Sequence, residues 1–489
     1  MLRLTSLLIL ICLVTVLFFV RHAQPFAPLV QVTTTAEQSL NLNPIISDDG
    51  NVLVFESNSN LGSGSQTSFH TIRTNISGVG LTLDEIAPSR SNAATLSGNG
   101  RFTAFASTED LIGENADRNS EIYLVDGSAL KQLTHTTPLD ENSRTTDGNY
   151  EPSISAEGRL IAFSSNRYGS SNVRDIVILD TVSKQISPIT NNANHSQATN
   201  PKLSADGSRI YFLNTTSLGE MSLMLWSSID HTVQIVSENI TGLSLAPTRV
   251  LSSDGNRLVY SAITGVNQSQ VFLYDYRTRE NHQLTHLGTR SSDVPLNPSI
   301  SGDGKRVTFA TRRRTAEPSD GSVELYVLDI PTGHIEQLTN APSTATGDVV
   351  SSLNHDGSRV AFSFPRVLTE TVSEQSSANN PEIYFTSVTP RPEFGVAQIA
   401  NAATRNFEDP KIAPDVIAVI TGHLLSNRTV QCDFHKELPF EIDQTSVQVN
   451  GTAARLLYVS PGEVVFVVPA TVVDGPVEVV VNNSEGFPA

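Results

Sequence analysis

Hydrophobic and polar positions recur along this chain with a period of 48 to 58 residues. Each repeat centres on a glycine, and these are Gly50, Gly100, Gly158, Gly207, Gly255, Gly304 and Gly357. An aliphatic residue stands four positions before the glycine: Ile46, Leu96, Ile154, Leu203, Leu251, Ile300 and Leu353. An aromatic residue follows five positions after it: Phe55, Phe105, Phe163, Phe212, Tyr260, Phe309 and Phe362. A fixed period of this length is typical of a repeat architecture.

Each repeat divides into four short β-strands. In the copy around Gly158, apolar alternation predicts strands at 152–155, 159–164 and 175–180, with a fourth beginning at 184–187. An acidic or amide residue directly precedes every repeat glycine, and glycine accepts the positive φ of a tight hairpin turn. Four strands in each unit are typical of a β-propeller blade, so seven units predict an all-β, seven-bladed β-propeller.

The fourth strand carries a short motif that also shows how the ring would close. Gln-Leu-Thr occurs at 132–134, 283–285 and 337–339, but no such strand follows the third strand of the last unit at 382–385. A similar segment, Val-Gln-Val-Thr at 30–33, precedes the first unit. We therefore predict that this N-terminal strand completes the last blade and covers its open edge.

At residues 297–309 the chain reads Asn-Pro-Ser-Ile-Ser-Gly-Asp-Gly-Lys-Arg-Val-Thr-Phe. This motif, matched well at 43–55 and 200–212, resembles the TolB-like (WD40-like) β-propeller repeat of bacterial envelope proteins. The resemblance covers about three quarters of the chain and implies a propeller over 28–388. TolB proteins also carry an α/β domain before the propeller, and the short distance from the N-terminal apolar segment to the first repeat predicts that this domain is absent.

A different pattern begins after a proline-containing linker at 389–400. Strands are predicted at 416–421, 446–449, 456–459, 464–468 and 477–481, which suggests a small immunoglobulin-like β-sandwich over 401–489. The stretch resembles a C-terminal module of secreted proteins from soil bacteria, especially acidobacteria, which implies an extracellular accessory domain. The chain stops just after a strand, so we expect this domain to be truncated.

Residues 1–27 predict export. Arg3 precedes fourteen residues, 7–20, of which only Thr15 is polar. This is the length of a signal-peptide core and short for a membrane span. Ala23 and Ala27 are the candidate cleavage positions, and the alternative is an uncleaved N-terminal anchor. The predicted location is therefore periplasmic or extracellular, with membrane contact only through an uncleaved N-terminal segment.

Charge and cysteine content exclude several classes of function. The formal net charge is −18, which opposes binding to nucleic-acid phosphates. The two cysteines, Cys12 and Cys432, exclude a disulfide framework and a cysteine-based zinc site. The chain has no Gly-x-Ser-x-Gly, His-Glu-x-x-His or phosphate-binding glycine loop. Acidic loops at 114–121 and 140–147 offer oxygen ligands for calcium, but their spacing favours solvated turns, and no cofactor is predicted.

The remaining place for function is the mouth of the central channel. We expect the innermost strand of each blade to begin seven residues before its glycine, at Asn43, Ala93, Glu151, Asn200, Thr248, Asn297 and Val350. The predicted ligand-binding set is Asn43, Glu151, Asn200, Thr248 and Asn297, whose side chains would hydrogen-bond a peptide or glycan. The competing interpretation, which the sequence favours, is that asparagine before proline serves turn chemistry in extended geometry.

Two further repeat features are given structural roles. The arginines that follow the turns are expected to cover blade surface or to pair with turn carboxylates: Arg209, Arg257, Arg306 and Arg359. Trp226, on a third strand, is expected to pack.

The sequence thus predicts a binding or scaffold protein of the bacterial envelope, whose propeller presents a face to a protein or a polysaccharide. Protein partners are preferred because propeller faces are broad. The alternative is a propeller enzyme, a polysaccharide lyase or hydrolase, with His70, His135, His195 and Glu151 as the residues to test.

Overall fold

The computed structural model describes residues 29–482 with short gaps. The gaps are 37–38, 60, 62–67, 78–80, 90–93, 139–147, 169–172, 192–195, 239, 265–267, 288–293, 313–320, 332, 342–344, 369–379, 389–397, 409, 423–424, 427–428, 443–444, 461 and 473–474. The predicted export segment therefore lies outside the described residues. Within the described ranges the secondary structure is strand, turn and bend, with no helix. Correspondingly, none of the described residues forms a helix that could span a membrane.

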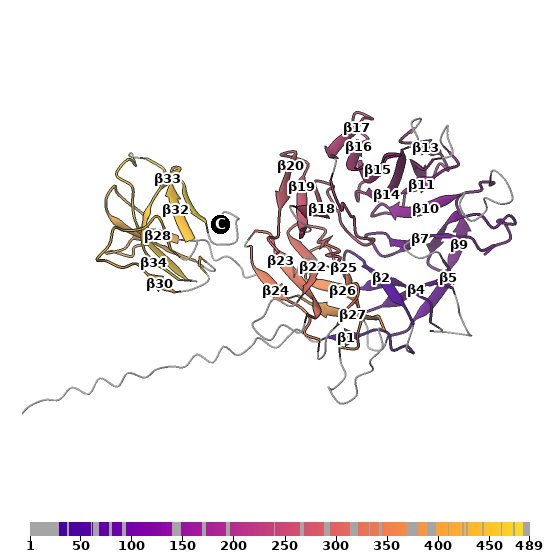
Figure 1. Ribbon diagram of the computed structural model, residues 1–489, viewed down its shortest axis with the longest axis horizontal. Helices are drawn as coiled ribbons and strands as arrows, with labels where there is room; N and C mark the ends of the chain where they lie inside the picture. The colour runs from indigo at the N-terminus through magenta and orange to yellow at the C-terminus, as the bar shows by residue number, and fades with distance from the viewer. Residues whose placement is uncertain are drawn as a thin grey trace, which may run out of the picture.

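The N-terminal part of the described chain forms seven antiparallel sheets, numbered here 1 to 7 along the sequence, which lie side by side around a common centre (Figure 1). Sheet 1 has β2 (Asn41–Ile46), β3 (Val52–Ser57), β4 (His70–Asn75) and β5 (Asp84–Pro88). Sheet 2 has β6 (Thr95–Leu96), β7 (Phe102–Ser107), β8 (Glu121–Asp126) and β9 (Ala129–Gln132). Sheet 3 has β10 (Asn149–Ile154), β11 (Leu160–Ser165), β12 (Asp175–Asp180) and β13 (Ile186–Pro188). Sheet 4 has β14 (Gln197–Leu203), β15 (Arg209–Thr215), β16 (Met221–Ser227) and β17 (Val233–Ser237).

Sheets 5 to 7 continue the series. Sheet 5 has β18 (Arg257–Thr264), β19 (Gln268–Asp275) and β20 (Glu280–Gln283). Sheet 6 has β21 (Ser299–Ile300), β22 (Arg306–Arg312), β23 (Val323–Asp329) and β24 (Ile335–Gln337). Sheet 7 has β25 (Val350–Leu353), β26 (Arg359–Phe364), β27 (Glu382–Ser387) and β1 (Val30–Gln31). The all-β, propeller-like architecture agrees with the four-strand repeat, apart from sheet 5.

Sheet 5 lacks the expected innermost strand. The segment before its turn makes two isolated bridges, Ser244 with Ser261 and Leu251 with Leu258. Between these bridges Pro247 has no N–H to donate. The next two residues bond to other sheets, since the Thr248 hydroxyl donates to the Ser351 carbonyl at 2.5 Å and the Arg249 carbonyl accepts from the Ile300 N–H at 3.1 Å. The four-strand prediction is therefore wrong for this repeat.

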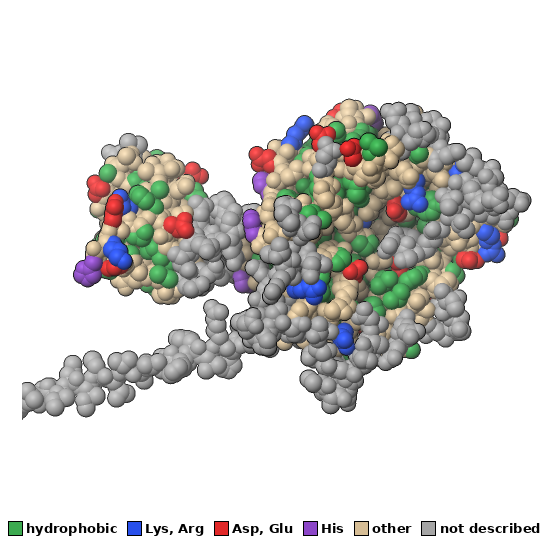
Figure 2. Space-filling view, in the orientation of Figure 1, with side chains coloured by type: hydrophobic (Ala, Val, Ile, Leu, Met, Phe, Trp, Pro, Cys, Tyr) green, Lys and Arg blue, Asp and Glu red, His purple; other side chains and the backbone are tan. Residues whose placement is uncertain are grey.

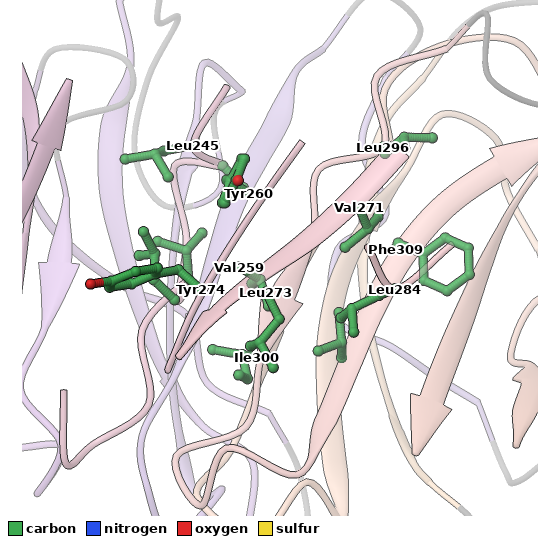
Figure 3. Packing of buried hydrophobic residues seen from close by; sticks show 14 of the residues in the cluster. Leu245, Val259, Tyr260, Val271, Leu273, Tyr274, Leu284, Leu296, Ile300 and Phe309 are labelled. Atoms are coloured by element: carbon green, nitrogen blue, oxygen red, sulfur yellow. The ribbon is translucent and has the colours of Figure 1, made fainter. Parts of the chain in front are cut away.

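The repeat residues build the core as predicted. The seven aromatic residues after the glycines are at most 2 % exposed and the seven aliphatic residues before them at most 7 % exposed. Figure 3 shows part of the largest cluster, in which Leu273 of sheet 5 lies near Ile300 of sheet 6 and Val271 of sheet 5 lies near Phe309 of sheet 6. Burial of this apolar surface between neighbouring sheets is the main stabilising contribution. Trp226 is also buried, as predicted.

Each repeat turn is fixed by the same hydrogen bonds. At Gly207, φ is 75°, the Ser204 hydroxyl donates to Asp206 Oδ1 at 2.7 Å, and the same hydroxyl oxygen accepts from the Arg209 N–H at 3.0 Å. All seven repeat glycines have positive φ. A side chain at Gly207 would also collide with Leu160 of the preceding sheet. In the last repeat Asn354 takes the place of the serine, donating to Asp356 and accepting from the Arg359 N–H. The turn thus explains the serine or asparagine, the acidic or amide residue and the glycine of the motif.

Backbone hydrogen bonds join the seven turns in a closed circuit. We call the residues two positions before each repeat glycine the turn ring: Asp48, Gly98, Ala156, Ala205, Ser253, Gly302 and His355. Bonds at or beside these positions connect each sheet to the next, beginning with the Asp48 N–H to the Gly98 carbonyl at 2.8 Å. The last bond runs from the His355 N–H back to the Asp48 carbonyl at 3.0 Å. Sheet 7 is therefore bonded directly to sheet 1.

The N-terminal strand pairs where the Gln-x-Thr motif predicted. β1 pairs with β27, with Val30 opposite Phe385. The Thr33 hydroxyl donates to the buried Glu382 carboxylate and accepts from the Ile383 N–H at 2.9 Å. Thr134 makes the same two bonds to Glu121 and to the Ile122 N–H in sheet 2.

The motif glutamine has an equally regular role. Gln31 Nε2 donates to the Thr33 carbonyl at 2.8 Å, and Gln132 donates to the Thr134 carbonyl at 2.9 Å. The motif therefore marks a strand that delivers a hydroxyl to the acidic residue at the start of the third strand. The chain's first described strand does this for its last repeat.

The arginines after the turns bond to the next sheet. Arg306 donates to the Gly357 carbonyl at 2.9 Å, and Arg359 donates to the Gly50 carbonyl at 2.9 Å. Arg306 also pairs with Asp329, at the end of its third strand, at 3.4 Å. The guanidinium of Arg306 thus joins a carboxylate of its own sheet to the carbonyl of the neighbouring turn.

Two further sheets follow the seventh and lie apart from the first seven in Figure 1. Most of the predicted linker at 389–400 lies outside the described residues, and its last three residues belong to a strand of these sheets. One has β28 (Gln398–Asn401), β29 (Ile417–Thr421), β35 (Glu463–Val467), β34 (Arg455–Val459) and β30 (Val430–Gln431) in that order. The other has β31 (Glu441–Ile442), β32 (Thr445–Val449), β33 (Thr452–Ala453) and β36 (Val479–Asn482). The five strands predicted here are present to within two residues at each end, and the two sheets bury a common core that includes Val447, Leu456 and Phe466.

Candidate functional site

Four of the residues predicted at the channel mouth occupy a left-handed backbone conformation. The φ angles are 53° at Asn43, 54° at Glu151, 53° at Asn200 and 40° at Asn297. The ladder register shifts at the first three, which is the mark of a β-bulge. The expected extended geometry before proline is therefore wrong. The innermost strands also begin earlier than predicted at β2, β10 and β14, so these residues bend a strand rather than start one.

Three of the side chains at these bends connect neighbouring sheets, and the fourth, Asn43, bonds within its own sheet. Asn200 Nδ2 donates to the Leu245 carbonyl and Asn297 Nδ2 to the Val349 carbonyl, both at 3.2 Å. The Glu151 carboxylate accepts from the Asn200 N–H at 2.8 Å. Asn43 donates to the buried Glu56 at 2.9 Å. These bonds offset the left-handed strain, which costs of order 1–3 kcal/mol per residue.

A polar cavity of about 100 Å³ lies on the axis between these bends and the turn ring. Residues of sheets 1 to 5 line it, including Thr248, Lys202, Arg249 and Asp48. Among the five predicted site residues only Thr248 belongs to its lining. The structure thus brings one predicted residue to the cavity. It places Glu151, Asn200 and Asn297 in hydrogen bonds between sheets and Asn43 in a hydrogen bond within sheet 1. Of the other two mouth positions, Val350 begins β25 and Ala93 lies outside the described residues.

The floor of the cavity is a hydrogen-bonded network across the axis. Arg249 of sheet 5 pairs with Asp48 of sheet 1 and donates to Ser253 Oγ at 3.4 Å. Ser253 Oγ lies 3.2 Å from His355 Nδ1 of sheet 7. A side chain at Gly302 would collide with this group, so the glycine permits its close packing. The network connects three sheets that are not consecutive along the chain.

Lys202 is the other cation of the cavity wall. Its side chain is half-buried, and Nζ donates to the Pro247 carbonyl at 3.1 Å. Burial lowers the pKa of Lys202 to about 8, although the charge of Glu151 acts in the opposite direction. The ammonium is therefore poorly compensated by its surroundings.

The histidines selected for the enzyme alternative are not brought together. His70 begins β4, the third strand of sheet 1, and its Nδ1 lies 2.6 Å from Glu85. His135 pairs with Glu114 at 2.9 Å on the surface of sheet 2. His195 lies outside the described residues. A separate pair, Ser253 and His355, has the spacing of a nucleophile and its base, with Arg249 as an additional donor to the hydroxyl.

Sequence reasoning missed the floor of the cavity. Asp48, Ser253 and His355 occupy the turn-ring position, where the other four repeats have glycine or alanine. Polar side chains at a repeat position that otherwise holds glycine or alanine were the signal in the sequence that could have identified this network. Lys202 is likewise the one charged residue five positions before a repeat glycine.

The two calcium hypotheses remain predictions. The loop at 140–147 lies largely outside the described residues. In the loop at 114–121, Glu114 faces His135, and Arg118 pairs with Glu109. Across the described part of the chain, no group of three or more His, Cys, Asp or Glu side chains is placed to hold a metal.

Comparison with known proteins supports the propeller-like class. No protein-family model matches the chain. Over 176 residues it is 27 % identical to a protein TolB homolog of Chlorobium luteolum, a match that spans 36 % of this chain and 35 % of the relative. The chain thus matches about a third of that relative's length. This similarity supports the TolB-like repeat.

Solved structures with similar folds include TolB from Acinetobacter baumannii, with 14 % identity, a TM-score of 0.37, and coverage of 72 % of this chain and 79 % of that one. The β-propeller domain of the trilobed protease from Pyrococcus furiosus has 13 % identity and a TM-score of 0.46, covering 71 % and 95 %. An oligogalacturonate lyase in complex with manganese has 13 % identity and a TM-score of 0.48, covering 75 % and 96 %. These neighbours include enzymes as well as TolB, and at these values they do not decide between activities.

Proposed function

We propose that this chain is an exported binding protein of the bacterial envelope, in which a closed seven-bladed propeller over 28–388 engages a partner at its axial mouth. In this proposal residues 1–27 direct export, and an immunoglobulin-like module that begins with β28 at Gln398 and extends to 489 attaches or spaces the propeller. The linker is therefore shorter than the predicted 389–400. The partner is a protein or a polysaccharide, and a protein is preferred. The similarity to a TolB homolog supports the assignment to the envelope.

The observation that carries the proposal is the polar axial cavity beneath four strained bends. Non-glycine residues in left-handed geometry persist only where the surroundings hold them, and they concentrate at functional sites. In this protein the four bend residues lie toward the end of the inner strands that is opposite the turn ring, which is the mouth. The cavity offers hydroxyl, guanidinium and ammonium groups, which suit recognition of a polar segment.

A matched pair of variants tests the binding site. Gln197 is exposed at the first position of β14, at the mouth end of the inner strand. Ile235 is 58 % exposed on β17, the outermost strand of the same sheet. The thermal midpoint of the full chain is measured against envelope proteins, peptides and cell-wall glycans. A ligand that binds the folded state raises the midpoint, and the proposal predicts that Gln197→Trp abolishes this rise while Ile235→Trp leaves it intact. The opposite pattern, or no rise with any class, contradicts the proposal.

The second candidate is a hydrolase, and it rests on the Ser253–His355 pair. In that case the Ser253 hydroxyl attacks the carbonyl carbon of an ester, His355 accepts its proton and passes it to the departing alcohol, and water then releases the acyl group from Ser253. Ser253→Ala would then abolish turnover of an ester substrate without changing the thermal midpoint of the free protein. Turnover that survives this substitution rejects the hydrolase.

A further inference from the structure

The axial cavity is a local cationic site in an acidic protein. Its lining contains two cations, Lys202 and Arg249, and one carboxylate, Asp48. Arg249 is already paired with Asp48, so Lys202 remains as the excess positive charge of the lining. The whole chain carries a net charge of −18, which repels anions at long range. Binding of an anion here would therefore reflect the cavity rather than a general surface potential.

The carboxylate of Glu151 is near enough to affect the charge of Lys202, but it also has other hydrogen-bond and ion-pair partners. Glu151 accepts hydrogen bonds from the Asn200 N–H and the Ser164 hydroxyl, and it lies 3.9 Å from Arg174. The Lys202 ammonium itself donates to a neutral carbonyl, that of Pro247. A half-buried ammonium held mainly by neutral dipoles gains from a fully charged partner.

The rest of the wall supplies hydroxyl groups and little space. Thr95, Ser153 and Ser253 contribute hydroxyls to the lining, whereas the Ser252 hydroxyl in the same wall already donates to Asp254. The cavity offers about 100 Å³ and is partly open to solvent. A carboxylate group with bridging waters fits this space.

We propose that the axial cavity binds one carboxylate group, which Lys202 holds with help from the wall hydroxyls, and that a flexible acidic side chain of the partner protein delivers it. This inference rests on the proposed binding function and specifies its chemistry. An Asp or Glu side chain places the carboxylate two or three bonds from its backbone, so it reaches a narrow cavity from a segment docked at the mouth. A uronic acid carries the group directly on its ring.

The lysines allow a direct test, because the chain contains only six: Lys131, Lys184, Lys202, Lys305, Lys411 and Lys436. Full-length protein with 13C-labelled lysine is titrated with alkali by NMR, and the Lys202 signal is assigned from the Lys202→Met variant. Titrations are repeated in chloride and in acetate of equal ionic strength, with an acetylated glutamate amide, with its glutamine analogue, and with galacturonate.

We expect acetate and the glutamate amide to raise the pKa of Lys202 by about one pH unit or more, while the other five lysines do not respond. The glutamine analogue and galacturonate are expected to leave all six unchanged. No response of Lys202 to either carboxylate, or an equal response of all six lysines, overturns the proposal. A response to galacturonate equal to that of the glutamate amide overturns its peptide source.

Failure of this inference is distinguishable from failure of the proposed function. Partner binding that Gln197→Trp abolishes, together with a silent Lys202, rejects the carboxylate site and keeps the mouth as the binding surface. A Lys202 signal that responds to carboxylates, in a protein for which no partner class raises the thermal midpoint, rejects the proposed partner binding alone.

Discussion

Removing one hydroxyl from the N-terminal strand should destabilise the entire seven-sheet ring. Thr33→Val keeps the shape of the side chain but deletes the donor to Glu382 and the acceptor for the Ile383 N–H. A hydrogen bond to a charged group contributes about 1.5–3 kcal/mol, and an unpaired buried N–H costs about 1–3 kcal/mol. Glu382 keeps further donors, among them the Thr35 N–H at 2.7 Å, so the combined loss should be about 2–4 kcal/mol.

The matched control is Thr134→Val, which deletes the equivalent two bonds inside sheet 2. Both variants are compared with the wild type by urea unfolding followed through tyrosine and tryptophan fluorescence. We expect similar decreases in the free energy of unfolding and unchanged m-values, because loss of either strand opens the same cooperative ring. A full effect of Thr134→Val with none from Thr33→Val would show that the N-terminal strand detaches without consequence, and this would refute the closure.

Three further predictions concern turns and pH. Gly207→Ala should lower the free energy of unfolding by about 2–4 kcal/mol, because it combines left-handed strain with a collision at Leu160. The control Gly219→Ala has φ of 82° and open space around it, so it should cost about 1 kcal/mol. Equal losses for the two variants in urea unfolding would contradict the packing argument. Burial acts to raise the pKa of Asp206, but hydrogen bonds from Ser204 and Ser208 hold it below its usual value. As pH falls below about 4, the Asp206 carboxylate therefore takes up its proton in the unfolded state first, and the free energy of unfolding decreases. Asp206→Asn should reduce this decrease in an acid titration. An acid titration identical to that of the wild type would contradict the role of Asp206. The pKa of Lys202 is lowered to about 8 in the folded state, whereas a lysine in the unfolded chain has a pKa near 10.4. As pH rises, Lys202 therefore loses its proton at a lower pH in the folded state than in the unfolded state. The unfolded chain binds more protons in that window, so the free energy of unfolding should rise with pH between about 8 and 10.4, and Lys202→Met should weaken the rise relative to wild type.

The strands and the core could be predicted because they depend on residues within one repeat. The glycine of each turn, the aromatic residue after it and the aliphatic residue before it act through local hairpin geometry and burial. The pairing of β1 with β27 was also accessible, since Thr33 repeats a motif that the internal blades carry.

The cavity could not be predicted from the sequence in the same way. Asp48 and Arg249 are 201 positions apart, and their pairing depends on the curvature of the ring rather than on a local pattern. The missing inner strand of sheet 5 depends on bonds from Thr248 and Arg249 to sheets 7 and 6. The conformation of Glu151 and Asn200 was misjudged because the local preference before proline yields to the bulge that the bonds between sheets stabilise.

Site-specific photocrosslinking in living cells tests the central claim most directly. A photoreactive amino acid is placed at Gln197, at the mouth, or at Ile235, on the outer edge of the same sheet. The account predicts a discrete crosslinked envelope protein from position 197 that position 235 does not give, and loss of this product when Lys202→Met is added. Crosslinks confined to position 235 would contradict the assignment of the axial mouth as the binding surface.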